Sequence, residues 1–177
     1  MPDCRGGRIG FLHSFAMTQD YIMRLIEQIA AMLAAIIAKR RNGQIEEARQ
    51  DLEATCGQTV GLTLEAVKQL SPEALASHLC DSGGNRYPRS VILAELLVQD
   101  AEILEAQGAT QEAIPGYLHA FCLLADAYPV LSSEEQAIYR PKLDALGAKL
   151  EHLPPNPYTT ERIARLAATR SVNHEIH

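Results

Sequence analysis

Two short stretches of this chain share one pattern, in which a glycine ends one helical segment and an alanine follows five residues later inside the next. In the first stretch Gly43 precedes Ala48, and in the second Gly108 precedes Ala113. Glycine readily adopts the left-handed backbone conformation that ends a helix. The two patterns are offset by 65 residues (108 − 43 and 113 − 48), so the sequence predicts two helical hairpins with matching turns.

The composition favours helices along the whole chain. The 177 residues are 47% apolar, which is enough to form a core, while aromatic residues make up 5% and tryptophan is absent. Ala, Leu, Ile, Glu and Gln dominate the long stretches, and most of these residues lose little side-chain freedom in a helix. We therefore expect an all-α fold of stacked antiparallel helical hairpins, because one hairpin alone cannot bury its apolar face.

Apolar spacing of three and four residues places helices at 18–42, 44–57, 61–70, 72–79, 89–107, 109–128, 133–153 and 159–170. Ser132 and Glu135 have the spacing of a capping box. Pro115 is expected to disturb the sixth helix, and Pro141 to kink or restart the seventh. The inward-facing residues of the seventh helix are expected to be Ile138, Leu143, Leu146 and Leu150.

The second hairpin resembles a tetratricopeptide repeat (TPR) at Gly108, Ala113, Tyr117 and Ala120, with Pro129 closing it later than the TPR pattern does. It departs from the repeat in lacking the large aromatic residue and the Leu-Gly pair of the first helix. Residues 18–130 also resemble a small bacterial family of helical proteins of unknown function, at Gln19, Asp20, Tyr21, Ile22, Arg24, Ile26, Glu27, Gln28, Gly43, Glu47 and Ala48. This resemblance implies a bacterial, cytoplasmic protein with TPR-like hairpins, and supplies no activity or catalytic residue.

The chain is expected to divide into three parts. Residues 1–17 are expected to be a flexible N-terminal extension, because the apolar stretch after Arg8 is too short for a signal peptide. Residues 18–153 are expected to form the TPR-like domain. Residues 154–177 contain a proline-rich break followed by a C-terminal helix. A cytoplasmic location is expected.

Charge and hydropathy argue against two classes of partner. The net charge of −6 disfavours nucleic acid, since binding to phosphates depends on Lys and Arg. The one basic cluster, at residues 39–41, is expected to be a solvated helix end. The longest apolar run, at residues 29–38, falls short of the roughly 20 residues that a membrane span requires. No nucleic acid and no membrane is therefore expected.

A polar group interrupts the otherwise apolar first helix at Asp20, Tyr21, Arg24, Glu27 and Gln28. These residues form either an ordinary charged helix start, with pairing four residues apart, or a surface that binds a partner peptide or sets the register of a dimer. The same face continues as small residues that let another helix come close, namely Ala31, Ala34, Ala35 and Ala38. A helix apolar around so much of its circumference has to be covered by its own chain or by a second copy, and we expect a homodimer.

The segment 82–90 is a candidate anion site. It combines Gly83 and Gly84 with Arg86 and Arg89 ahead of a helix, and helix N-termini and guanidinium groups bind anions. A simple loop between helices has the same composition. No Gly-Lys-Ser/Thr sequence follows, which excludes a nucleotide-binding P-loop.

No residue pattern indicates a catalytic centre, a cofactor or a metal. His119 and Cys122 lie three residues apart, but a structural zinc site takes four ligands. The cysteines, expected to be reduced, are Cys4, Cys56, Cys80 and Cys122. The favoured function is a non-catalytic protein–protein interaction or scaffold module. The alternative is a small-anion-binding protein or enzyme that uses the 82–90 loop.

Overall fold

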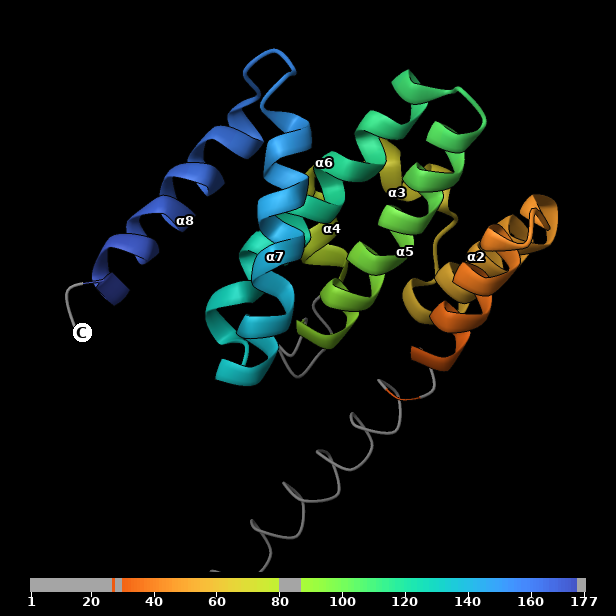
Figure 1. The fold of residues 1–177 in the computed structure, drawn as a ribbon, viewed down its shortest axis with the longest axis horizontal. Coiled ribbons are helices and arrows are strands. Elements are labelled where there is room, and N and C mark those ends of the chain that lie inside the picture. Colours follow the sequence, from red (N-terminus) through yellow and green to blue (C-terminus); the bar gives the residue numbers. More distant parts are fainter. Residues whose placement is uncertain (1–26, 28–29, 80–86, 175–177) are drawn as a thin grey trace, which may run out of the picture.

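The computed structural model describes residues 27, 30–79 and 87–174 (Figure 1). Every regular element in these ranges is a helix and none is a strand, which confirms the expected all-α fold for the described residues. The three-part domain division and the TPR-like stacking stay predictions. The proposed extension at residues 1–17 lies outside the described part of the chain.

The two glycine turns have the same hydrogen-bonded geometry. A helical segment at residues 30–41 ends before Gly43, which has φ 78°, and α2 (Ile45–Val60) follows. α5 (Tyr87–Ala106) ends before Gly108, which has φ 81°, and α6 (Thr110–Ala127) follows. At the first turn the N–H of Gly43 donates to the carbonyl of Arg40, and the N–H of Gln44 donates to the carbonyl of Lys39.

The second turn repeats both bonds, from Gly108 to Glu105 and from Ala109 to Leu104. This pair of bonds defines the Schellman motif, which satisfies carbonyl groups left over at a helix end. The expected turns at both glycines are therefore confirmed.

Two short helices connect the hairpins. They are α3 (Leu64–Gln69), capped by the Thr63 side chain, and α4 (Pro72–Leu79), in whose first turn the Ser71 hydroxyl accepts from the N–H of Ala74. The expected end of the preceding helix at residue 57 was wrong. α2 continues to Val60, which is buried, and ends at Gly61 with φ 75°.

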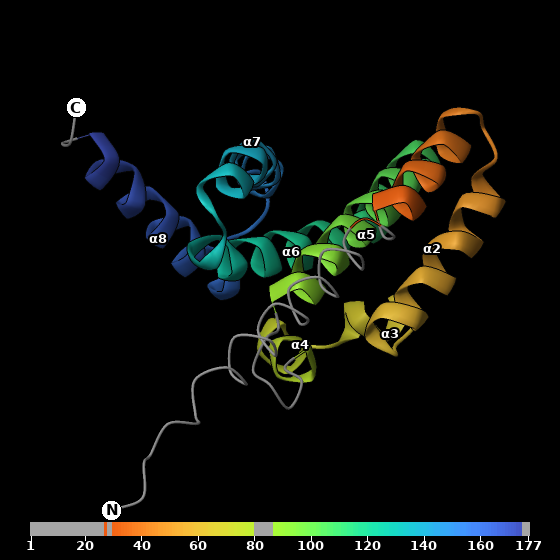
Figure 2. The same ribbon diagram turned by 90° about the horizontal axis from the view of Figure 1, so that it is seen from below.

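α5 and α6 form the centre of the molecule and make its most extensive helix contact. They approach closely at Gly116, where an added Cβ atom would lie 3.2 Å from the Leu97 carbonyl oxygen and 3.2 Å from the Ala101 Cβ. α4 and α7 lie on opposite sides of α6 (Figure 2). The largest fully buried side chains of this core include Leu93, Leu96, Leu97, Ile103, Phe121 and Leu124.

α7 (Ser133–Leu150) begins with the expected capping box, formed by Ser132 and Glu135. It runs without interruption through Pro141, as α6 does through Pro115, so neither proline restarts its helix. The expectation that Ile138 faces inward was wrong, because its side chain is 60% exposed. The buried residues Leu143, Leu146 and Leu150 lie on one side of α7, because they are three and four residues apart. Continuing this spacing towards the N-terminus leads to residue 139, so residue 138 lies off the buried side.

A short 3₁₀ turn, η1 (Tyr128–Val130), joins α6 to α7. The last helix, α8 (Pro157–His174), begins earlier and ends later than the expected range 159–170. It packs against α6 and diverges from α7 in both views (Figures 1 and 2).

Candidate functional site

The residues 30–38 form an apolar helical segment with one exposed side. All nine are non-polar, in the order Ala-Ala-Met-Leu-Ala-Ala-Ile-Ile-Ala. Ile36 is fully buried, and Leu33 and Ile37 are half-buried. The exposed residues are Ala30, Ala31, Ala34, Ala35 and Ala38. We call Ala31, Ala34, Ala35 and Ala38 the alanine strip.

The alanine strip lies along one side of the helix, since residues three and four apart stack one above another. It spans about 10 Å at 1.5 Å per residue. Alanine side chains leave the backbone close to the surface, so a second helix can approach near the short end of the usual 8–10 Å interaxial range. The four residues assigned to a dimer contact from sequence are thus all accessible.

Ion pairs at the end of this segment join it to two neighbouring helices. Lys39 Nζ lies 2.7 Å from the Asp51 carboxylate on α2, and Arg40 pairs with Glu102 on α5. The hydroxyl of Thr55 on α2 lies 3.9 Å from the Met32 sulfur. Lys39 and Arg40 therefore connect this segment to α2 and α5, so the expectation that they belong to a solvated helix end was wrong. Arg41 is exposed, as expected.

The predicted partner-binding residues fall mostly outside the described chain. Glu27 is helical and exposed. Asp20, Tyr21, Arg24 and Gln28 lie outside the described residues. Their assignment to a partner or a dimer stays a prediction.

Most residues of the predicted anion site also lie outside the described residues. Gly83, Gly84 and Arg86 lie outside the described residues, whereas Arg89 is half-buried in the first turn of α5. No contact of Arg89 in the structure favours an anion over an ordinary helix start. The anion-binding function stays a prediction.

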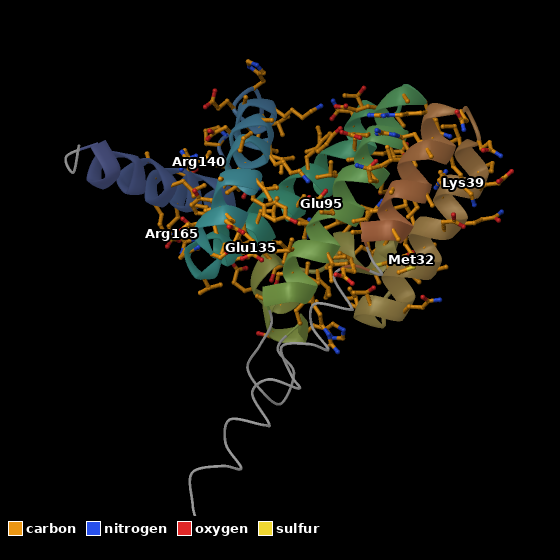
Figure 3. All side chains as sticks on the ribbon, turned by 60° about the horizontal axis from the view of Figure 1, so that its bottom comes forward. Met32, Lys39, Glu95, Glu135, Arg140 and Arg165 are labelled. Carbon is orange, nitrogen blue, oxygen red and sulfur yellow. The ribbon has the colours of Figure 1, made fainter. Side chains whose placement is uncertain are left out.

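Sequence reasoning missed a row of carboxylates along one side of α5, at Glu95, Glu102 and Glu105. Glu95 pairs with Lys142 of α7, and Glu105 with Lys149 of α7 at 2.9 Å, while Glu102 pairs with Arg40. Figure 3 shows Glu95 between α7 and the segment that carries Lys39. Their spacing of seven and three residues marks one helix side, but only the tertiary structure shows that cations from two neighbouring helices approach it. Each carboxylate has a cationic partner, so the row ties helices together.

His119 and Cys122 are buried on α6 and do not converge as a metal site. The Nδ1 atom of His119 lies 2.7 Å from the Pro115 carbonyl oxygen, and its Nε2 atom lies 2.7 Å from that of Leu70. Both ring nitrogens are thus engaged with the backbone. Among the described residues there is no group of three or more His, Cys, Asp or Glu side chains placed to hold a metal ion.

Burial dominates the chemistry of the two described cysteines. It raises the pKa of the Cys56 thiol to about 12 and that of Cys122 to about 11, because an apolar surrounding disfavours the thiolate. Both are free and buried, in keeping with the expected reduced core cysteines; Cys4 and Cys80 lie outside the described residues.

Comparison of the chain with protein-family models, curated proteins and solved structures finds no match. The resemblances to the TPR and to the bacterial helical family therefore stay predictions. Within the described ranges, no helix has both the length and the apolar character needed to cross a membrane.

Proposed function

We propose that this protein is a non-catalytic interaction module that binds another polypeptide through the alanine strip. The observation that supports the proposal is the exposure of Ala31, Ala34, Ala35 and Ala38 within a run of nine residues that contains no polar side chain. Contiguous apolar surface on a water-soluble domain commonly marks a binding site. Covering this strip with a helix removes it from water without burying a charge.

The proposed partner is a second copy of the chain. A two-fold interface places the same surface against itself, so a charged strip would face its own charge. The alanine strip has none, although the chain carries a net charge of −6. A strip of this length is smaller than the about 800 Å² per partner of a standard interface. The proposal therefore includes the predicted contact residues Asp20, Tyr21, Arg24, Glu27 and Gln28.

Charge insertion in the strip tests this proposal. Ala34→Glu and Ala35→Glu place an unpaired carboxylate in the proposed interface, and burying it there is costly. Light scattering coupled to size exclusion is expected to give twice the chain mass of 19.4 kDa for the wild type and the single-chain mass for either variant.

Ala54→Glu is the matched control, because Ala54 is exposed and belongs to α2, outside the strip. This variant is expected to keep the wild-type mass. A wild-type protein that has the single-chain mass at all concentrations would contradict the homodimer proposal. If Ala34→Glu and Ala54→Glu lower the measured mass equally, the alanine strip is not the dimer interface.

A further inference from the structure

The contact of α8 with the rest of the chain centres on one carboxylate. The guanidinium of Arg162 binds Asp126 on α6 through both oxygens, with Nε 3.1 Å from Oδ1 and Nη2 2.7 Å from Oδ2. Arg165 Nη2 lies 2.7 Å from Oδ1 of the same carboxylate. Arg162 also donates to the Tyr158 carbonyl at 2.7 Å. We call Asp126, Arg162 and Arg165 the Asp126 clamp.

Among the described apolar side chains of α8, none is fully buried. Among the described side chains of α8, the two buried ones are Thr159 and Arg162, and Leu166 is half-buried against the core. Ile163 is 37% exposed. The hydrophobic effect scales with apolar area removed from water, so the clamp contributes to the docking of α8 alongside a small apolar contact.

The clamp is partly closed to water. Arg162 is 8% exposed, and its guanidinium also lies 3.8 Å from Glu73 on α4. Burial is the largest single effect and lowers the pKa of Arg162, but the hydrogen bond with Asp126 and the negative charges of Asp126 and Glu73 together outweigh it, and the pKa is raised. Arg162 thus stays charged, and the contact depends on Asp126 being charged as well.

α8 covers a thiol. The Sγ atom of Cys122 on α6 lies 3.8 Å from the Tyr158 carbonyl oxygen, and Cys122 is 1% exposed. The connection from α7 contains Pro154 and Pro155, which restrict the backbone next to α8 without hydrogen-bonding it to α7. Lifting α8 would give solvent access to Cys122 and leave Asp126 and Glu73 without their arginine partner.

We infer that α8, which the Asp126 clamp holds against α4 and α6, separates from these helices in a local opening while α2, α5 and α6 stay folded. Helices with few buried apolar contacts open at lower free energy than the core. This inference concerns the opposite end of the chain from the alanine strip and does not depend on the proposed dimer.

Alkylation of the two buried cysteines tests the inference within one molecule. The full-length chain with Cys4→Ser and Cys80→Ser is treated with N-ethylmaleimide at neutral pH, and the rates at Cys122 and Cys56 are followed by peptide mass spectrometry. Cys56 on α2 is fully buried and reports unfolding of the main body. Cys122 is expected to react about tenfold faster or more, and high salt is expected to raise its rate alone, because salt screens ion pairs.

Asp126→Asn is expected to raise the alkylation rate of Cys122 further, since it removes the nearest counter-charge of the buried Arg162 and leaves only the more distant Glu73. Arg165→Gln, at a residue that is exposed, is expected to give a smaller acceleration without a risk to folding. Asp144→Asn removes the carboxylate of the Arg140–Asp144 pair on α7 and is expected to leave the Cys122 rate unchanged. Equal rates at Cys122 and Cys56 in all of these proteins and salt conditions would overturn the inference.

Discussion

The hydroxyl of Tyr117 on α6 donates a hydrogen bond of 2.7 Å to the carboxylate of Glu105 on α5. Lys149 of α7 binds the same carboxylate at 2.9 Å, and its Nζ atom lies 4.4 Å from the centre of the Tyr117 ring. One carboxylate therefore connects three helices. Burial and the bond to Glu105 both raise the pKa of Tyr117, so its hydroxyl remains a donor at physiological pH.

Tyr117→Phe is expected to lower the free energy of unfolding by about 1.5 to 3 kcal/mol, the range for a hydrogen bond to a charged group. The aromatic ring stays in place beneath Lys149, so the loss of stability measures the contribution of the hydroxyl group alone. Tyr139→Phe is the control, because Tyr139 has a similar cation near its ring but no hydroxyl hydrogen bond among the described residues. Urea unfolding monitored by circular dichroism measures both, and equal losses would contradict this role of Glu105.

The contribution of Glu105 to the stability of the fold is expected to depend on pH. Desolvation raises the pKa of Glu105, but hydrogen bonds from Lys149 and Tyr117 outweigh it and lower the pKa below its usual value of 4.5. A group with a lowered pKa in the folded state stabilises the fold above its unfolded pKa, and this contribution is lost as the pH falls through the folded pKa. The stability difference between wild type and Glu105→Gln is therefore expected to shrink from pH 6 towards pH 3. A difference that stays constant over this range would contradict the assignment.

Replacing Gly116 is expected to disturb the close contact between α5 and α6. Gly116→Ala adds a Cβ atom 3.2 Å from a backbone oxygen of α5, so the helices have to move apart at a cost of about 1 to 3 kcal/mol. Gly57→Ala is the matched control, because its Cβ would meet no atom within 4 Å inside α2. This control is expected to stabilise the fold by about 0.5 to 1 kcal/mol through helix propensity. Thermal unfolding compares the two, and a shift of the same sign in both variants would contradict the close approach.

His119 is expected to link α6 to the end of α3. His119→Leu removes the contacts of both ring nitrogens, with the Pro115 and Leu70 carbonyl oxygens, one of which receives the ring N–H of the neutral imidazole, and losing that buried hydrogen bond costs about 1 to 3 kcal/mol. His78 makes a similar contact of 3.0 Å with the Val60 carbonyl but is exposed, so water can replace its ring in His78→Leu. Urea unfolding is expected to show the larger loss for His119→Leu, and the reverse order would contradict this reading.

Local signals in the sequence predicted the helix turns and caps. The turns at Gly43 and Gly108 and the capping box at Ser132 depend on residues within six positions of one another, so their spacing is visible in the chain itself. The end of α2 was misplaced because Gly57 fits inside a helix and Gly61, four residues later, supplies the left-handed conformation. A glycine in the sequence does not reveal which of the two roles it takes.

Contacts between distant residues could not be predicted in the same way. Asp126 and Arg162 are 36 residues apart, and no local pattern pairs them. Ile138 has the apolar character of a core residue, yet the register of α7 against α6 leaves it exposed. The alanine strip was identified from its small residues, whereas its exposure depends on the packing of Ile36 on the core and on the ion pairs of Lys39 and Arg40 with α2 and α5.

Disulfide trapping across the proposed two-fold axis tests the central claim most directly. Ala34 lies near the middle of the alanine strip, where a residue of one copy is expected to meet the same residue of the other. With Cys4 and Cys80 replaced by serine, Ala34→Cys is expected to form a covalent dimer on mild oxidation, because Cβ atoms of facing residues come within disulfide range. Ala54→Cys on α2 is expected to remain a single chain. Failure of Ala34→Cys to cross-link, or equal cross-linking at both positions, would contradict the account.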